Sequence, residues 1–135
     1  MFALDTNIII YAINRRRPEL AARISDELRA GRPLIVPAIV RHELEYGFAK
    51  SERRSADRAN LETLLARGFE QPAFDEDDAA EAGDIRAALQ ALGTPIGPYD
   101  ILIAAQARRR GAVLVTLNRR EFERVPGLMV TDWAR

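Results

Sequence analysis

The first apolar segment of the chain is very short and ends abruptly in polar residues. Residues 2–4 (Phe-Ala-Leu) run straight into Asp5, and three consecutive isoleucines at 8–10 follow soon after. A short apolar run bounded by polar residues predicts a buried strand, and the segment after it is expected to be a helix. Asp5 would then lie at the carboxyl end of a central strand, where open α/β sheets bind ligands. The alternative is that Asp5 or Thr6 only caps the next helix, and this stretch alone favours the cap.

Further short apolar runs alternate with helical patterns along the rest of the chain. Strands are expected at 34–36, 112–115 and 128–131, and helices at 8–14, 19–30, 38–50, 56–68, 79–92 and 101–107, with a short helix around Glu121 and Phe122. Residues 69–74 contain a proline and are expected to form a weak edge strand or a loop. Strands separated by helices indicate βαβ units and a parallel sheet, and 135 residues suit one domain.

Composition narrows the function classes. Twenty basic and twenty acidic residues cancel, so nonspecific nucleic-acid binding through bulk charge is not implied. Cysteine is absent, which excludes disulfides and thiolate metal sites. Nothing at the N-terminus resembles a signal peptide, and no apolar stretch approaches the ~20 residues of a membrane helix, so we expect a soluble cytoplasmic protein.

Almost all the basic residues are arginines, and Lys50 is the only lysine. The arginines cluster at 15–17, 53–54, 108–110 and 119–120. Arginine suits bidentate contacts with phosphate or carboxylate, but a solvated helix face or a compositional bias explains any one cluster equally well.

Several acidic residues occupy positions that a simple helix surface does not explain. Glu43 lies four residues after Ile39 and four before Gly47, on the helix face that should be buried. A buried carboxylate is costly unless it forms an ion pair or binds a metal, and the pattern leaves both possibilities open. Asp100 opens a very apolar helix, where the helix dipole also favours it. The acidic run 75–78 precedes another helix and is interpreted as capping and solvation.

These acids should converge if the sheet is parallel. The carboxyl ends of parallel strands form one edge, on which Asp5 and Thr116 fall, and Glu43 and Asp100 come from helices that begin at this edge or lie against it. Clustered carboxylates repel one another, and a divalent metal is the usual resolution. Magnesium prefers oxygen ligands, and a bound ion can activate water against a phosphodiester. The sole histidine, His42, should point away from Glu43 and is given a surface role.

The sequence resembles PIN-domain proteins, and specifically the VapC-type toxic ribonucleases of bacterial type II toxin–antitoxin pairs. The resemblance spans the chain in order, through LDTN at 4–7, RHELEYG at 41–47, GTPIGPYDILIAAQA at 93–107, VLVTLNRREFERVPGL at 113–128 and DW at 132–133. It implies a single PIN domain over residues 1–135, with a three-layer α/β/α fold and a central, mainly parallel sheet of four to five short strands flanked by helices.

The resemblance also implies the residues of a site. Asp5, Glu43 and Asp100 match the family's acidic metal-binding residues, and Asn7 and Thr116 match polar residues that line the same pocket. Many PIN proteins carry an aspartate two residues after the threonine, where this chain has Asn118. Glu121 is the nearest acid and is assigned to the fourth position, with Asn118 as a site-lining neighbour.

The implied reaction is Mg²⁺-dependent hydrolysis of RNA, with Mn²⁺ as a possible substitute, and Asp5 and Asp100 would hold the ion. Substrate phosphates are assigned to the arginines near this edge, namely Arg15, Arg16, Arg17, Arg119 and Arg120. A VapB-type antitoxin is the expected partner, and the toxin is expected to form a homodimer. One rival is a degenerate PIN domain that binds RNA or serves as a scaffold without cleavage. A phosphotransferase of the haloacid-dehalogenase type is disfavoured because it needs a second aspartate where this chain has Asn7.

Overall fold

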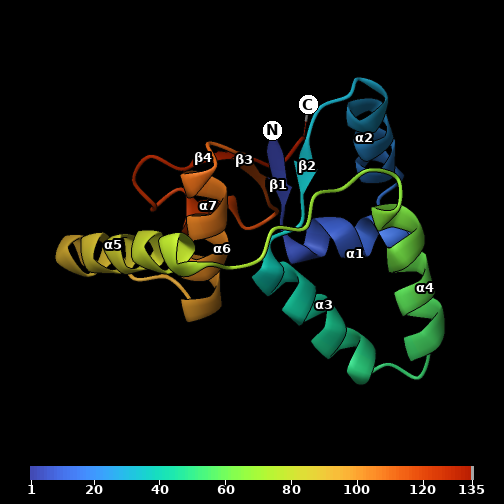
Figure 1. Ribbon diagram of the computed structural model, residues 1–135, viewed down its shortest axis with the longest axis horizontal. Coiled ribbons are helices and arrows are strands. Elements are labelled where there is room, and N and C mark those ends of the chain that lie inside the picture. Colours follow the sequence, from blue (N-terminus) through green and yellow to red (C-terminus); the bar gives the residue numbers. More distant parts are fainter. Residues whose placement is uncertain (135) are drawn as a thin grey trace.

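Short parallel strands form the centre of the molecule (Figure 1). The computed structural model describes residues 1–134, and within them one sheet contains β1 (Phe2–Leu4), β2 (Leu34–Ile35), β3 (Val113–Val115) and β4 (Met129–Thr131). The strand order is β2-β1-β3-β4, and every pair is parallel. The register aligns Phe2 with Leu34 on one side and with Val113 on the other. The expected parallel sheet is therefore confirmed, with β1 in an interior position.

Helices connect the strands and cover the sheet. They are α1 (Thr6–Asn14), α2 (Pro18–Arg29), α3 (Ala38–Ala49), α4 (Arg54–Leu65), α5 (Glu76–Leu92), α6 (Pro98–Arg109) and the short α7 (Arg119–Phe122). Figure 1 shows α5 and α6 on one side of the strands and α2 and α4 on the other, with α1 and α3 near the lower ends of the strands. Among the described residues, no helix is long and apolar enough to cross a membrane.

Several boundaries differ from the sequence expectation for identifiable reasons. The first helix begins at Thr6 rather than residue 8, because Asp5 serves as its N-cap. The helix that carries Asp100 begins at Pro98, so Asp100 lies within its first turn instead of opening it. Residues 69–74 form a loop with a single bridge between Glu70 and Ile35, because Pro72 cannot continue a ladder.

The core brings α6 close to the sheet. Ala104, Ala105 and Ala107 have no exposed surface, and α6 contacts β3. Ile8 and Ile9 of α1 are also fully buried. Small side chains allow the helix axis to approach the strands, and this close approach places the first turn of α6 next to the carboxyl ends of β1 and β3.

The interpretation of the acidic run 75–78 was only half right. Asp75 caps α5 and forms a capping box with Asp78, as expected for acids at a helix N-terminus. The expectation that these acids are exposed to solvent is wrong for Asp78, which is fully buried. Its carboxylate accepts hydrogen bonds from Arg109 Nε and Arg110 Nη1, each at 2.7 Å. Burial of the carboxylate is tolerated because two guanidinium groups at the C-terminal end of α6 compensate it. Arg109 and Arg110 are thus part of the link between α5 and α6.

Candidate active site

Asp5 lies at the carboxyl end of β1 and fulfils both roles that the sequence left open. Its Oδ1 accepts a hydrogen bond from the backbone N–H of Thr6 at 2.8 Å, which caps α1. Its Oδ2 accepts a second bond from Thr116 Oγ1 at 2.7 Å. Burial raises the pKa of Asp5 despite these two bonds, and the nearby charges of Glu43 and Glu121 raise it further.

Thr116 joins the ends of β1 and β3. Its side chain is fully buried, and besides donating to Asp5 its hydroxyl oxygen accepts the backbone N–H of Asn118 at 3.0 Å. One hydroxyl therefore orients a carboxylate and holds the turn that follows β3. Thr116 therefore contacts Asp5 at the shared edge of β1 and β3, and its role in a functional site stays a prediction.

Glu43 reaches the same place from α3. The fully buried stripe of this helix consists of Val40, Leu44 and Phe48, so the half-buried Glu43 lies at the edge of the stripe rather than within it. Its Oε1 accepts a hydrogen bond of 2.6 Å from Thr6 Oγ1. Within residues 1–134 no arginine or lysine forms an ion pair with Glu43, so this part of the chain does not support the ion-pair alternative.

Thr6 is the residue that sequence reasoning missed. It was considered only as a possible cap, yet its hydroxyl ties Glu43 to the start of α1. Its position directly after Asp5 was the available signal, but contact with Glu43 depends on how α1 and α3 pack.

Asp100 and Glu121 form a pair of carboxyl groups opposite Asp5. The charge of each carboxyl acts on the other, while Glu121 Oε1 accepts a hydrogen bond from the backbone N–H of Gly97 at 2.8 Å and Oε2 accepts one from Asn118 Nδ2 at 2.6 Å. Burial, followed by the charges of Glu121 and Asp5, raises the pKa of Asp100 to about 7. The Gly97 N–H holds the pKa of Glu121 below its usual value. Of this pair, Asp100 therefore binds a proton more readily than Glu121.

We call Asp5, Glu43, Asp100 and Glu121 the acidic cluster. Each lies near enough for its charge to act on another member, although they come from four different elements or element ends. Among residues 1–134, no three acidic, histidine or cysteine side chains are positioned to enclose a metal ion by themselves. The acidic cluster therefore offers carboxylate oxygens from separate elements and no closed metal-binding shell within these residues.

The other residues assigned to the site lie further out. Asn7 is exposed at the start of α1, and Asn118 contacts Glu121 as described. Arg17 pairs with Glu19 at 3.1 Å, and Arg119 pairs with Glu123 at 3.0 Å. Exposed positions are also occupied by Arg15, Arg16 and Arg120. Their assignment to substrate phosphate stays a prediction.

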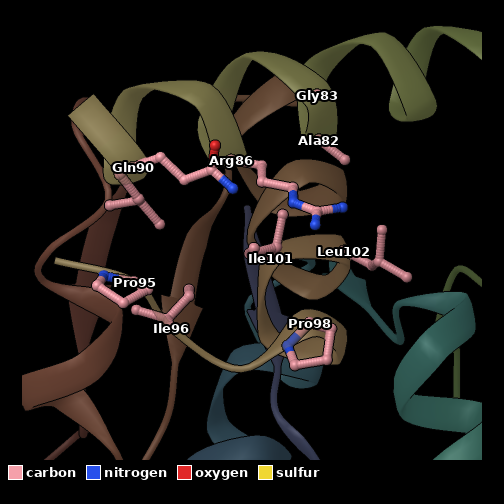
Figure 2. A pocket seen from close by; sticks show the side chains of 10 residues that line it. Ala82, Gly83, Arg86, Gln90, Pro95, Ile96, Pro98, Ile101 and Leu102 are labelled. Carbon is pink, nitrogen blue, oxygen red and sulfur yellow. The ribbon is translucent and has the colours of Figure 1, made fainter. Parts of the chain in front are cut away.

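Two grooves lie near the helices that carry the acidic cluster, and only one of them is lined by an acid of the cluster. A groove of about 570 Å³ lies between α5 and α6, with Pro95, Ile96 and Pro98 on its floor and Arg86 and Gln90 on α5 (Figure 2). It lies beside the loop that precedes Asp100, but no acid of the cluster lines it. A second groove, of about 370 Å³, runs between α1, α3 and α4, and Glu43 is part of its wall. We call this second one the α1/α3/α4 groove.

Comparison with known proteins agrees with this architecture. The PIN domain profile matches residues 2–128. The chain is 40% identical over 132 residues to the tRNA(fMet)-specific endonuclease VapC of Salmonella typhimurium, covering 98% of this chain and 97% of that protein. It is 42% identical over 132 residues to the ribonuclease VapC2 of Haemophilus influenzae, with the same coverage.

Solved structures give the same result. The crystal structure of DNA-bound VapBC from Salmonella typhimurium superposes with a TM-score of 0.88 at 39% identity, covering 98% of this chain and 97% of that chain. The VapBC2 structure from Rickettsia felis, bound to a promoter DNA fragment, also has a TM-score of 0.88, at 32% identity and 96% coverage of both chains. The profile, the identities and the fold together show that this chain belongs to the PIN-domain family.

Proposed function

We propose that this protein is the toxin of a type II toxin–antitoxin pair and acts as a metal-dependent endoribonuclease. Relatives that match nearly the full length are named ribonucleases or endonucleases, and nucleases of this family are generally metal-dependent. The observation that carries the proposal is the acidic cluster, in which four carboxyl groups distant in sequence meet beside the carboxyl ends of β1 and β3. Such like charges have no structural benefit to one another, whereas they suit a cation.

The donor set fits Mg²⁺, which we propose as the metal, with Mn²⁺ as a substitute. Every member offers carboxylate oxygen, and Mg²⁺ is typically bound by one or two carboxylates together with waters and substrate phosphate. An incomplete protein shell is therefore the expected arrangement. Asp5 and Asp100 would hold the ion, and Glu43 and Glu121 would complete the cluster or orient water.

The residues of the site have distinct roles in the proposed hydrolysis. A bound ion would lower the pKa of the attacking water and stabilise charge on the leaving oxygen. The oxygen of this water would form a bond to phosphorus and lose a proton, the phosphorus–oxygen bond to the leaving ribose would break, and the ribose oxygen would gain a proton, so that one water is added in total. Thr116 and Thr6 keep the carboxylates of Asp5 and Glu43 in place, and Gly97 and Asn118 do so for Glu121.

Cleavage of mixed RNA that includes tRNA tests this proposal. Purified protein with Mg²⁺ should cut RNA in a reaction that EDTA stops, and Asp5→Asn or Asp100→Asn should abolish it. Asp77→Asn is the matched control, because Asp77 is a strongly exposed aspartate on α5. Cleavage that survives both cluster substitutions contradicts the mechanism, and RNA binding without cleavage indicates the non-catalytic alternative.

The partner and the assembly belong to the same proposal. An antitoxin segment would occupy the α1/α3/α4 groove, whose apolar residues Ile10, Ile13 and Phe48 lead to Glu43. We further propose a single domain, a homodimer and a cytoplasmic location. Co-expression with the product of an adjacent small gene should yield a complex without RNase activity, and sedimentation of the free protein measures the dimer.

A further inference from the structure

Two exposed tyrosines and the only histidine lie on the same two helices, α3 and α6, as Glu43 and Asp100. Tyr99 precedes Asp100, and His42 precedes Glu43. The rings of His42 and Tyr99 contact each other edge-to-face, with centroids 5.5 Å apart. Tyr46 follows His42 by one turn of α3, so both side chains lie on the same side of that helix. We call His42, Tyr46 and Tyr99 the aromatic platform.

The exposure of these rings is unusual for this chain. Tyr46 and Tyr99 are 59% and 52% exposed, whereas the other phenylalanine, tyrosine and tryptophan side chains in residues 1–134 are buried or half-buried. Because burying an aromatic ring is strongly favourable, exposed rings gathered at one place indicate contact with something outside the chain. Here the rings are carried by the helix turns that also carry Glu43 and Asp100.

A single positive charge extends the platform along α3. Lys50 Nζ lies 4.2 Å from the centroid of the Tyr46 ring, and Lys50 follows Tyr46 by another turn. His42, Tyr46 and Lys50 thus form a stripe about 12 Å long that leads away from Glu43. A stripe of aromatic rings with a cation at its far end is suited to bind single-stranded nucleic acid, because the rings can stack on bases and the cation can contact a phosphate.

The charge of the site does not favour the binding of RNA, so the substrate requires other attractive contacts. The acidic cluster repels phosphate, and the chain as a whole has no net charge that would attract RNA. Substrate binding must therefore draw on contacts other than bulk charge. Base stacking on aromatic rings is the main non-electrostatic attraction for unpaired RNA, and specific RNA recognition usually targets unpaired bases.

We propose that Tyr99, His42 and Tyr46 stack on unpaired bases of the RNA next to the scissile phosphate, and that Lys50 contacts a phosphate further along. This inference rests on the proposed ribonuclease function and names how the substrate is positioned. The aromatic platform binds single-stranded segments or loops, whereas duplex RNA keeps its bases stacked on one another. These side chains position the substrate, and none of them takes part in the chemical step.

Cleavage kinetics give the first test. Tyr46→Leu and Tyr99→Leu should each raise KM for a loop-containing RNA by about tenfold, while kcat changes by less than about twofold, since stacking of one base contributes at that level. Tyr46→Phe and Tyr99→Phe should keep KM near the wild-type value. Leu92→Ala is the control, because Leu92 is a 62% exposed apolar side chain at the end of α5. An unchanged KM in both leucine variants, with wild-type cleavage intact, overturns the proposal and leaves the ribonuclease function standing.

Binding gives a second test that does not depend on cleavage. Asp100→Asn protein should bind an RNA of about 12 nucleotides roughly tenfold more tightly than the same strand with abasic sites. This preference should disappear when Tyr46→Leu and Tyr99→Leu are added. Equal binding of the two strands by the parent protein overturns the platform. The proposal is also overturned if Tyr46→Leu and Tyr99→Leu change the sedimentation of the protein but leave its RNA binding unchanged. That result would show that this surface contacts a second copy of the chain.

Discussion

Asp5 shows how one side chain can support both a helix and a reactive site. One carboxylate oxygen caps α1, and the other is held by Thr116 at the centre of the acidic cluster. Removing the carboxyl group with alanine would also remove the cap, at a cost of about 1 kcal/mol. Asparagine caps helices as well as aspartate does, so Asp5→Asn separates loss of charge from loss of the cap.

The raised pKa of Asp100 predicts that the site destabilises the metal-free protein. A carboxyl whose folded pKa is about 7 costs stability as the pH rises from about 4 to 7, and the cost is complete above 7. Asp100→Asn should therefore increase the free energy of unfolding in EDTA by about 1–2 kcal/mol near pH 8, after allowance for solvent screening. Urea unfolding at about pH 8 and pH 5 measures this, and the gain should be smaller at pH 5. Equal gains at both pH values would show that amide packing, not charge, is responsible.

Sequence alone was sufficient to place Asp5, Glu43 and Asp100 together, because strand ends in a parallel sheet meet at one edge. It could not find the contact from Thr6 to Glu43, or the N–H of Gly97 that holds Glu121. Both contacts depend on rotation and spacing of helices, which hydrophobic periodicity does not fix. The roles of these residues in catalysis stay predictions.

The link between α5 and α6 determines where the first turn of α6 lies. Asp78 connects the two helices through Arg109 and Arg110, and Arg108 adds an ion pair with Glu81 at 2.5 Å. Sequence patterns predicted both helices but not this link, since a run of acids and a run of arginines each resemble a solvated surface. Helix positions were thus predictable, while the side chains that join them were not.

Asp78→Asn tests this link. The substitution leaves two guanidinium groups beside a buried amide and should lower the free energy of unfolding by about 3 kcal/mol. The two arginines hold the pKa of Asp78 far below its usual value, so the contribution is present at neutral pH and is lost only in strong acid. Chemical denaturation near pH 7 provides the measurement. Asp77→Asn, in the same turn but exposed, should have little effect, and a similar loss in both variants would contradict the assignment.

At the scale of the whole molecule, the net charge is zero although negative charge is concentrated at one place. Twenty acidic and twenty basic residues cancel, yet four carboxyl groups gather at one edge of the sheet. Among residues 1–134, the arginines that form ion pairs do so with acids outside the acidic cluster. Arg41 and Arg58, for example, both pair with Glu45. Under the proposed function, a bound cation would neutralise the acidic cluster.

A cation that relieves this repulsion should stabilise the fold. Mg²⁺ at about 100 times its dissociation constant should raise the free energy of unfolding by about 2.7 kcal/mol, since it binds the folded state. Thermal unfolding with Mg²⁺ and with EDTA measures the effect. Asp5→Asn and Asp100→Asn should remove most of it, whereas Asp77→Asn should not. Equal stabilisation of all variants would indicate that the ion binds elsewhere.

The interior position of β1 has a consequence for biosynthesis. The strand is made first, yet its neighbour β3 begins at Val113, and Thr116 and Glu121 come later still. A nascent polypeptide on the ribosome therefore lacks part of the sheet and of the reactive centre until most of the chain has emerged. Products of premature termination before Val113 would lack Thr116 and Glu121, so the proposed nuclease would become active only after β3 and α7 have been made.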